Sequence, residues 1–226
     1  NYFFDGPAPD GREKINHERY GIKKPARYPY YRFHERFRVA EHVNEPNRFG
    51  WVVEIDPKDP ESRPVKRTSL GRFLREAAQV VVDKSGRVVV YSGDDAYFEY
   101  IYRWVSDARY EPDSPQANRH ILDNGTLSVA RCEEDGRLIW LPLFFGENGL
   151  TPDNGFHSQA DVLLEVRRAA DIVGGTPMDR PEDVEISPVT GRVYAMLTKN
   201  KKRGKRVDGV NSRASNHYGQ VLEMIP

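Results

Sequence analysis

The fold is decided by the stretch Glu76-Ala-Ala-Gln-Val-Val-Val-Asp-Lys-Ser-Gly-Arg-Val-Val-Val-Tyr91. Its β-branched run is followed by a polar turn that ends in Gly86-Arg87, and a second run of valines completes the unit. Glycine supplies the positive φ that a tight turn requires, and valine and tyrosine favour strands. The stretch therefore predicts an antiparallel hairpin that is led by a glutamate.

The same pattern occurs again at Arg180-Pro-Glu-Asp-Val-Glu-Ile-Ser-Pro-Val-Thr-Gly-Arg-Val-Tyr194, where Glu182 leads the unit. Repeated hairpins of this kind build the blades of β-propellers, whose sites collect residues from several blades around a central channel. We therefore predict an all-β fold made of β-propeller blades. Glu76 and Glu182 each precede a strand in this prediction, so both are expected to face the channel.

One segment departs from the strand pattern. Residues 158–175 carry apolar side chains at helical spacing, with Ser158 as N-cap and Asp161 three residues later, and Gly174-Gly175 at the end. This predicts one inserted α-helix near residues 159–173 that lies against the sheet edges or over the channel.

The chain is expected to have two parts. Residues 1–48 are rich in tyrosine, arginine, proline and histidine, with little periodicity, and strand patterns begin after them. Within this part, residues 27–38 have the composition of an aromatic and basic nucleic-acid platform. We favour an irregular aromatic and basic insertion over residues 1–48, packed on the propeller, and incomplete propeller blades over residues 49–226.

The charge balance and hydropathy exclude several functions. Lysine plus arginine and aspartate plus glutamate both count 34, so no net charge attracts nucleic acid or an anionic membrane surface. No apolar run approaches the roughly 20 residues that span a bilayer. The single cysteine, Cys132, excludes an internal disulfide, and its strand-like surroundings predict a structural thiol rather than a nucleophile.

The termini predict an interior piece of a longer protein. The chain begins at Asn1 without a methionine or signal sequence, and the strand pattern of residues 220–226 stops at its end. Its length accounts for about three blades of a propeller.

The chemistry concentrates around Arg180 and Glu182, which flank Pro181. Proline favours an extended conformation in the residue before it, and residues i and i+2 of an extended segment point the same way. A carboxylate beside a guanidinium suits a site where the carboxylate holds a metal and the arginine holds an anion with two hydrogen bonds. A structural salt bridge at the end of a blade is the alternative.

A second group of charged residues surrounds the first hairpin. Glu76 precedes an apolar strand, where a buried carboxylate needs a cation or hydrogen bonds, and Arg75 is the alternative partner to a metal. Asp94 and Asp95 are suited to calcium or to capping a turn, and we favour the turn-capping interpretation.

Eight segments from Arg48 to the C-terminus carry a resemblance in collinear order: Gly50-Trp-Val-Val-Glu-Ile-Asp-Pro-Lys-Asp-Pro60, Pro64-Val-Lys-Arg-Thr68, Gly71-Arg-Phe73, Tyr91-Ser-Gly-Asp-Asp95, Tyr100-Ile-Tyr102, Gly149-Leu-Thr-Pro152, Ser158-Gln-Ala-Asp161 and Met178-Asp-Arg-Pro-Glu-Asp183. Together they strongly resemble the PhoX-type bacterial alkaline phosphatases. The resemblance implies a six-bladed propeller that hydrolyses phosphate monoesters at a cluster of iron and calcium ions. It also implies a monomeric enzyme that is periplasmic or secreted, without insertion into a membrane and without a nucleic-acid partner.

The resemblance also assigns roles to single residues. Glu76 and Glu182 match glutamates that bind metal, and Arg180 matches the arginine that binds the substrate phosphate. Glu76 stands in Arg-Glu-Ala-Ala, where the family usually has Glu-Gly-Ala. Cys132 does not match the family's iron-binding cysteine, which together with another metal-binding glutamate would precede Asn1; further aspartates would follow Pro226.

These departures lead to an expectation about activity. The piece alone carries part of the metal site, so we expect it to be inactive as a phosphatase and to hold either no metal or one calcium ion. Two other functions stay open, a non-catalytic propeller that binds protein or peptide and a calcium-dependent propeller lactonase or esterase. The metal content of the full-length protein distinguishes all three.

Overall fold

A computed structural model describes residues 3–6, 10–22 and 25–226. The chain divides into two compact units, Asn1–Trp51 and Val52–Pro226. Residues 1–2, 7–9 and 23–24 of the predicted insertion lie outside the described residues. None of the helices in the described part is long and apolar enough to cross a membrane.

The first unit is held together by aromatic side chains. A small buried cluster contains Phe4, Ile22 and Val39, and the ring of Phe4 meets the ring of Phe49 edge-on at 5.4 Å between centroids. The sequence analysis predicted no regular element here, but Arg12–Arg19 forms helix α1. The helix is strongly polar, which explains why apolar spacing did not reveal it. Three short 3₁₀ helices follow: η1 (Tyr30–Arg32), η2 (Glu35–Phe37) and η3 (Glu45–Arg48).

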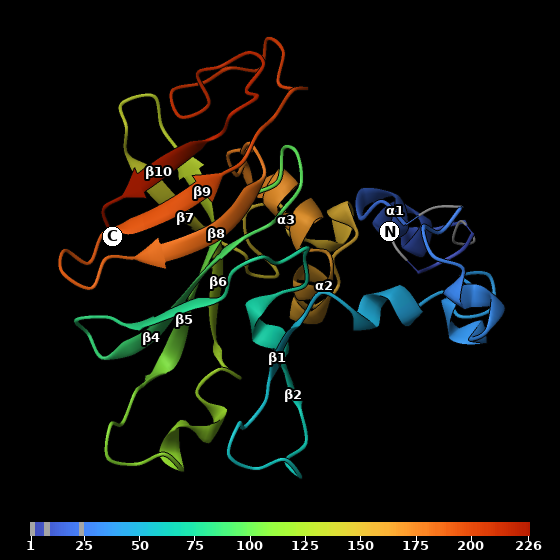
Figure 1. Ribbon diagram of the computed structural model, residues 1–226, viewed down its shortest axis with the longest axis horizontal. Helices are drawn as coiled ribbons and strands as arrows, with labels where there is room; N and C mark the ends of the chain where they lie inside the picture. The colour runs from blue at the N-terminus through green and yellow to red at the C-terminus, as the bar shows by residue number, and fades with distance from the viewer. Residues whose placement is uncertain (1–2, 7–9, 23–24) are drawn as a thin grey trace. The chain divides into compact units, whose positions relative to one another are not determined.

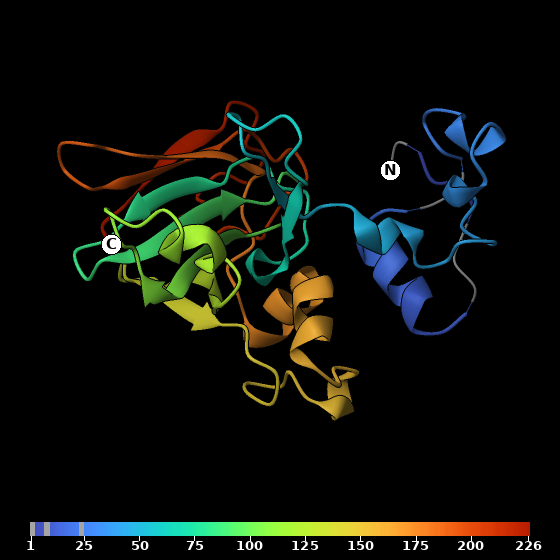
Figure 2. The same ribbon diagram turned by 90° about the horizontal axis from the view of Figure 1, so that it is seen from below.

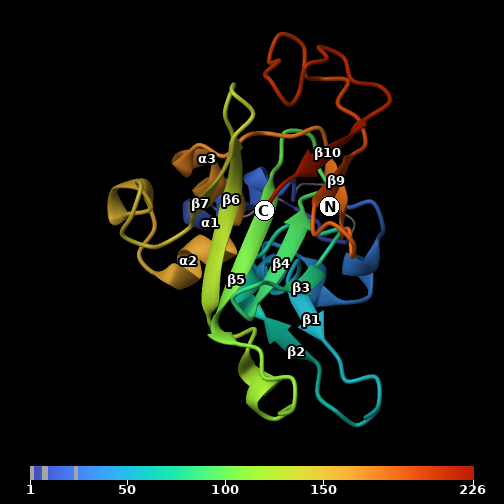
Figure 3. The same cartoon turned by 90° about the vertical axis from the view of Figure 1, so that its left-hand side faces the viewer.

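The second unit contains three antiparallel sheets (Figures 1 and 3). The smallest pairs β1 (Val52–Glu54) with β2 (Val65–Arg67). A five-stranded sheet has the order β3-β4-β5-β6-β7 and a three-stranded sheet the order β10-β9-β8. Their strands are β3 (Gln79–Val82), β4 (Arg87–Gly93), β5 (Ile101–Arg109), β6 (Gly125–Cys132), β7 (Leu138–Pro142), β8 (Pro181–Ile186), β9 (Val193–Leu197) and β10 (Gln220–Met224). Further 3₁₀ turns lie at η4 (Thr68–Leu70), η5 (Ala117–His120) and η6 (Pro152–Asn154).

Both predicted hairpins are present. β3 pairs with β4 and β8 pairs with β9, each antiparallel. The turn glycines Gly86 and Gly191 have φ values of 83° and 71°, as tight turns between strands require. The mostly antiparallel β architecture is therefore confirmed.

The five-stranded sheet lies between two apolar layers. Successive side chains of β4 point to opposite faces, so Val88 and Val90 join one buried cluster while Val89 and Tyr91 join the other. The first cluster packs against the helices and the second against the three-stranded sheet. Figure 2 shows this order, with the orange helices and the red and orange strands on opposite sides of the green sheet.

The single predicted helix is instead two helices, α2 (Gln159–Leu164) and α3 (Val166–Val173). The predicted ends are correct, because Ser158 accepts a hydrogen bond from the amide of Asp161 and Gly174 is left-handed. The interruption is caused by a residue that lies far away in the sequence. Arg72 donates its backbone N–H to the carbonyl of Leu163 (2.9 Å) and a guanidinium N–H to that of Leu164 (3.2 Å). These two carbonyls therefore accept hydrogen bonds from Arg72, a residue outside both helices. The chain turns at the buried Glu165.

A glycine allows the two larger sheets to approach each other. A Cβ atom added at Gly93, the last residue of β4, would lie 2.4 Å from the carbonyl oxygen of Glu182 and 2.7 Å from that of Pro181. Both obstacles are backbone atoms of β8, which cannot rotate away as a side chain would. The absence of a side chain at Gly93 therefore brings the end of β4 against the start of β8.

We expect Gly93→Ala to destabilise the fold by about 1–3 kcal/mol, because the extra methyl group forces β4 and β8 apart. The free energy of unfolding in urea measures this effect. Gly209→Ala is the matched control, since its Cβ would meet its nearest neighbour, Glu134, at an ordinary 3.9 Å. Equal stability of the two variants would show that the strands yield freely at this contact.

Candidate active site

Arg180 is the centre of a charged cluster at the start of β8. Its guanidinium Nη2 lies 2.8 Å from Oδ1 of Asp95 and 2.9 Å from Oε1 of Glu182. All three side chains are partly shielded from solvent, with 14–31% of their surface exposed. Two carboxylates from segments far apart in the sequence therefore meet at one arginine.

The predicted contact between Arg180 and Glu182 exists, but the predicted backbone geometry is wrong. Arg180 is not extended; its φ is 58°, in the left-handed region that arginine seldom occupies. Glu182 does not precede the strand but lies within β8, where the register shifts between Pro181 and Val184. The two side chains therefore meet across a local irregularity, not along a regular strand.

Glu76 belongs to the same electrostatic environment. Its backbone N–H donates to the carbonyl of Gly93 at 3.3 Å, which places it beside the end of β4, and the residue as a whole is exposed. Partial desolvation of its carboxyl group, followed by the negative charges of Asp95 and Glu182, raises the pKa of Glu76. The structure thus brings Glu76 near Asp95, Arg180 and Glu182.

Three further side chains lie around this cluster. Thr198, directly after β9, donates its hydroxyl to Oε1 of Glu182 at 2.9 Å. The guanidinium of Arg180 lies 6.0 Å from the centroid of the Tyr97 ring, and the ammonium of Lys202 lies 5.8 Å from the same centroid. The cluster is therefore lined by a hydroxyl donor and a second cation as well as by carboxylates.

The alternative partner for Glu76 lies elsewhere. Arg75 donates to the hydroxyl of Ser92 and to the carbonyls of Leu70 and Gly71, and its guanidinium stacks 3.8 Å from the ring centroid of Phe73. Burial lowers the pKa of Arg75 to about 9. These contacts position Arg75 inside the fold, and they leave the Glu76 carboxylate to face the Arg180 cluster.

The turn-capping interpretation of Asp94 and Asp95 is wrong. Asp94 is fully buried and binds Arg167 of α3 with two hydrogen bonds, at 2.7 and 2.5 Å. Asp95 instead faces Arg180, as described above. Sequence reasoning offered calcium binding for this acidic pair but favoured turn capping, so it set Asp95 aside as a site residue, and it did not identify Thr198 or Tyr97. The adjacent acidic pair directly after Ser92-Gly93, the end of β4, was the available signal for Asp95, whereas a lone threonine or tyrosine gives none.

The carboxylates of this cluster are of the type that a cation preferring oxygen ligands binds, although within the described residues their oxygen atoms do not form a group of three that all lie within 4.8 Å of one another. Asp95 and Glu182 bring two carboxylates to one guanidinium, and Glu76 lies near enough that their charges, after desolvation, raise the pKa of its carboxyl group. Oδ1 of Asp95 is buried and has no hydrogen bond, although it is ion-paired to Arg180. Excess negative charge and an oxygen atom with spare acceptor capacity are what a bound calcium or similar hard cation would neutralise.

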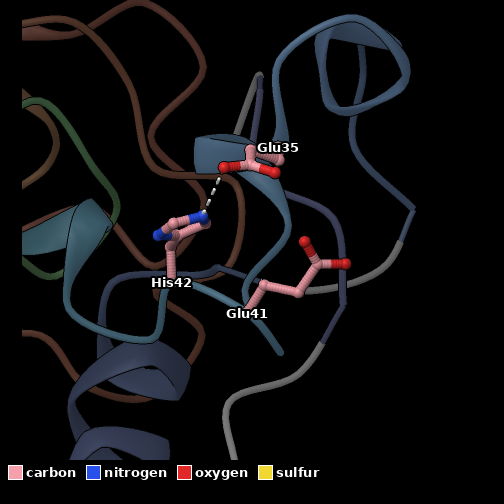
Figure 4. Close-up of side chains that lie close together, drawn as sticks. All are labelled: Glu35, Glu41 and His42. Carbon is pink, nitrogen blue, oxygen red and sulfur yellow. Dashed lines mark ion pairs between the residues drawn. The ribbon is translucent and has the colours of Figure 1, made fainter.

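Another group of possible ligands lies in the first unit. Within the described residues, the ligand atoms of Glu35, Glu41 and His42 all lie within 4.8 Å of one another. Figure 4 shows Glu35 and His42 facing each other, with an ion-pair distance of 3.7 Å. Glu35 and Glu41 are exposed, and exposed acidic groups gather on many surfaces without a metal.

Cys132 is not placed as a ligand or nucleophile. It ends β6, its backbone N–H donates to the hydroxyl of Thr176 at 2.8 Å, and it packs with the apolar cluster between the two larger sheets. Burial, followed by the charges of Asp208 and Glu133, raises the pKa of Cys132 to about 11. The thiolate that metal binding or nucleophilic attack requires is therefore scarce at neutral pH.

Comparison with known proteins identifies a family and a solved structure to which the chain is similar. No curated protein matches the chain. The solved structure described as "Pseudomonas fluorescens PhoX in complex with vanadate, a transition state analogue" matches with a TM-score of 0.93 and 45% sequence identity. The match covers 98% of this chain and 40% of that one, so this chain spans about two fifths of the solved protein. The profile of the family described as alkaline phosphatase PhoX matches residues 3–226. The chain therefore belongs to the PhoX alkaline phosphatase family.

Proposed function

We propose that this chain supplies the arginine and several carboxylates of the active site of a metal-dependent phosphomonoesterase. The observation that carries the proposal is the Arg180 cluster, in which one guanidinium meets Asp95 and Glu182 with Glu76 beside them. The similarity to a PhoX structure that holds vanadate supports the same function, because vanadate is described there as a transition-state analogue.

Arg180 is the residue that would bind the substrate phosphate. A guanidinium presents parallel N–H donors that match two phosphate oxygens, and its charge offsets theirs. In the structure one of these nitrogens, Nη2, is engaged by both Asp95 and Glu182, so a phosphate group competes with carboxylates at this nitrogen. Such competition is relieved when the carboxylates are engaged by cations.

Glu76 and Glu182 are the proposed metal-binding residues, with calcium and iron as the expected ions. Asp95 faces the same space and is suited to join them. The bound ions would stabilise the charge that moves to the leaving oxygen and supply an activated oxygen nucleophile. The residues of this chain contribute by holding negative oxygen ligands and by orienting the phosphate. The hydroxyl of Thr198 fixes one oxygen of Glu182.

The wider arrangement follows from the same proposal. The β3–β4 and β8–β9 hairpins are interpreted as parts of blades in a six-bladed propeller, with the charged cluster directed at its channel. Residues 1–48 are interpreted as an insertion on that propeller and residues 49–226 as incomplete blades. We propose a monomeric, periplasmic or secreted enzyme that acts on phosphate monoesters and does not bind nucleic acid.

The proposal is tested by assaying the full-length enzyme that contains this chain with a chromogenic phosphomonoester, before and after a chelator. We expect turnover that the chelator abolishes and that added calcium and iron restore, whereas the 226-residue chain alone shows none. Metal analysis of the same preparation distinguishes the other functions. Calcium without iron points to a lactonase or esterase, and neither metal points to a binding module.

A further inference from the structure

A buried ionic network is centred on the residue directly before the proposed phosphate-binding arginine. Asp179, the residue before Arg180, is fully buried. Its Oδ1 accepts from Nε of Arg203 at 2.5 Å, and its Oδ2 accepts from Nδ2 of Asn216 at 2.9 Å. Arg203 and Asn216 are 2% and 1% exposed. Each oxygen of this carboxylate thus has its own donor, and both donors come from the segment after β9.

Arg203 also binds the backbone on both sides of the network. Its Nη2 donates to the carbonyl of Pro177 at 2.7 Å and its Nη1 to that of Arg206 at 2.8 Å. A single guanidinium therefore joins the segment that leads into Arg180 to the loop that follows β9. Buried ion pairs contribute little net stability compared with apolar residues of similar size, but in some proteins they restrict a segment to one arrangement.

Arg180 needs such a restriction because its conformation is unfavourable. A side-chain-bearing residue with a φ of 58° costs about 1–2 kcal/mol relative to ordinary conformations, and it persists only where the surroundings enforce it. The backbone contributes two bonds here: the amide of Thr198 donates to the carbonyl of Arg180 (3.2 Å) and that of Lys199 to the carbonyl of Asp179 (3.3 Å). The side chain of Asp179 adds its own bonds to Arg203 and Asn216, at the residue directly before Arg180.

We propose that Asp179 and Arg203, with Asn216, are positioning residues that hold Arg180 in the left-handed conformation from which its guanidinium reaches the phosphate. They touch no reacting atom, so their effect passes entirely through Arg180. The inference rests on the proposed phosphatase function. It adds to that function the residues that fix the orientation of the phosphate-binding group.

The test uses Asp179→Asn in the full-length enzyme, alone and combined with Arg180→Ala. The amide keeps the size of the carboxylate but loses its charge, so the arginine network loosens without a cavity. We expect KM for a phosphomonoester and the inhibition constant of vanadate to rise at least tenfold, because small displacements of an orienting group cost one to two orders of magnitude. Bound metal should stay at the wild-type level. In the Arg180→Ala background, Asp179→Asn should change KM less than twofold.

Asp123→Asn is the matched control. Asp123 also pairs with a buried arginine, Arg67 at 2.6 Å, but it contacts none of the residues of the Arg180 cluster. Its KM and vanadate inhibition should stay within twofold of the wild type. Arg203→Lys provides a second variant in case Asp179→Asn does not fold. Lysine keeps the positive charge but lacks the several N–H donors of the guanidinium. We expect KM and the vanadate inhibition constant to rise in this variant too, but by less than in Asp179→Asn.

Hydrogen exchange at the Thr198 amide tests the positioning role without activity. This amide bonds to Arg180, so it should exchange faster in Asp179→Asn and unchanged in Asp123→Asn. Two results would overturn the positioning role and leave a structural one. The first is a Thr198 amide that exchanges at the same rate in Asp179→Asn and the wild type, and the second is additive effects of Asp179→Asn and Arg180→Ala on KM. If the wild-type enzyme hydrolyses no phosphomonoester, the proposed function fails, and the exchange measurement still decides whether Asp179 positions Arg180.

Discussion

Replacing Arg180 by alanine in the full-length enzyme is expected to lower kcat/KM for a phosphomonoester roughly 100- to 1000-fold. The reason is that a preorganised charged donor is lost from the position where phosphate charge develops, and removal of one such donor typically has this effect. Vanadate inhibition should weaken in parallel, while circular dichroism and bound metal stay unchanged. Steady-state kinetics with a chromogenic substrate measure the loss.

Arg192→Ala is the control for this experiment. Arg192 also pairs with a carboxylate, at 2.7 Å from Glu223, but the pair is exposed on the β9–β10 surface. Removing an exposed pair costs little, so activity and stability should match the wild type. Full activity of Arg180→Ala would remove this residue from phosphate binding.

Replacing Glu182 by alanine should instead deplete bound metal. The variant loses a carboxylate that lies near Asp95 and Glu76, and it leaves the hydroxyl of Thr198 with the carbonyl of Arg180, at 3.2 Å, as its remaining acceptor. Even partners that only orient a metal ligand contribute about 10- to 100-fold to metal affinity, so loss of a direct ligand should have at least this effect. Elemental analysis after dialysis measures the metal content, and turnover should fall with it.

Glu185→Ala is the matched control, because Glu185 is a carboxylate of the same strand that is exposed to solvent. It should retain wild-type metal content and turnover. A metal content that is unchanged in Glu182→Ala would place the metal ligands elsewhere and would leave Glu182 as the ionic partner of Arg180.

Much of the second unit could be predicted from local sequence. Valine-rich runs around Gly86 and Gly191 specify hairpins because turn conformation and strand propensity act over a few residues. The ends of the helical region were equally accessible, since Ser158 and Gly174 act on their own neighbours. The interruption at Glu165 was not, because it depends on Arg72, which lies far away in the sequence.

The candidate site shows the same limit. Arg180 and Glu182 were identified because they are two residues apart and because a carboxylate beside a guanidinium suits the binding of a metal and an anion. Asp95 joins them across 85 residues, and its approach depends on how β4 packs against β8 at Gly93. The left-handed backbone of Arg180 was also beyond local rules, because the residue before proline ordinarily favours extended geometry. Tertiary contacts override that preference here.

The left-handed conformation of Arg180 sets stability against function at this one position. Glycine adopts a φ of 58° without the steric cost that arginine incurs, so a protein selected only for resistance to unfolding would drift towards glycine there. Such a drift would discard the guanidinium that meets Asp95 and Glu182. Thermostability engineering guided by backbone geometry alone would therefore favour the very substitution that removes the phosphate-binding group, and position 180 should be held fixed in any such design.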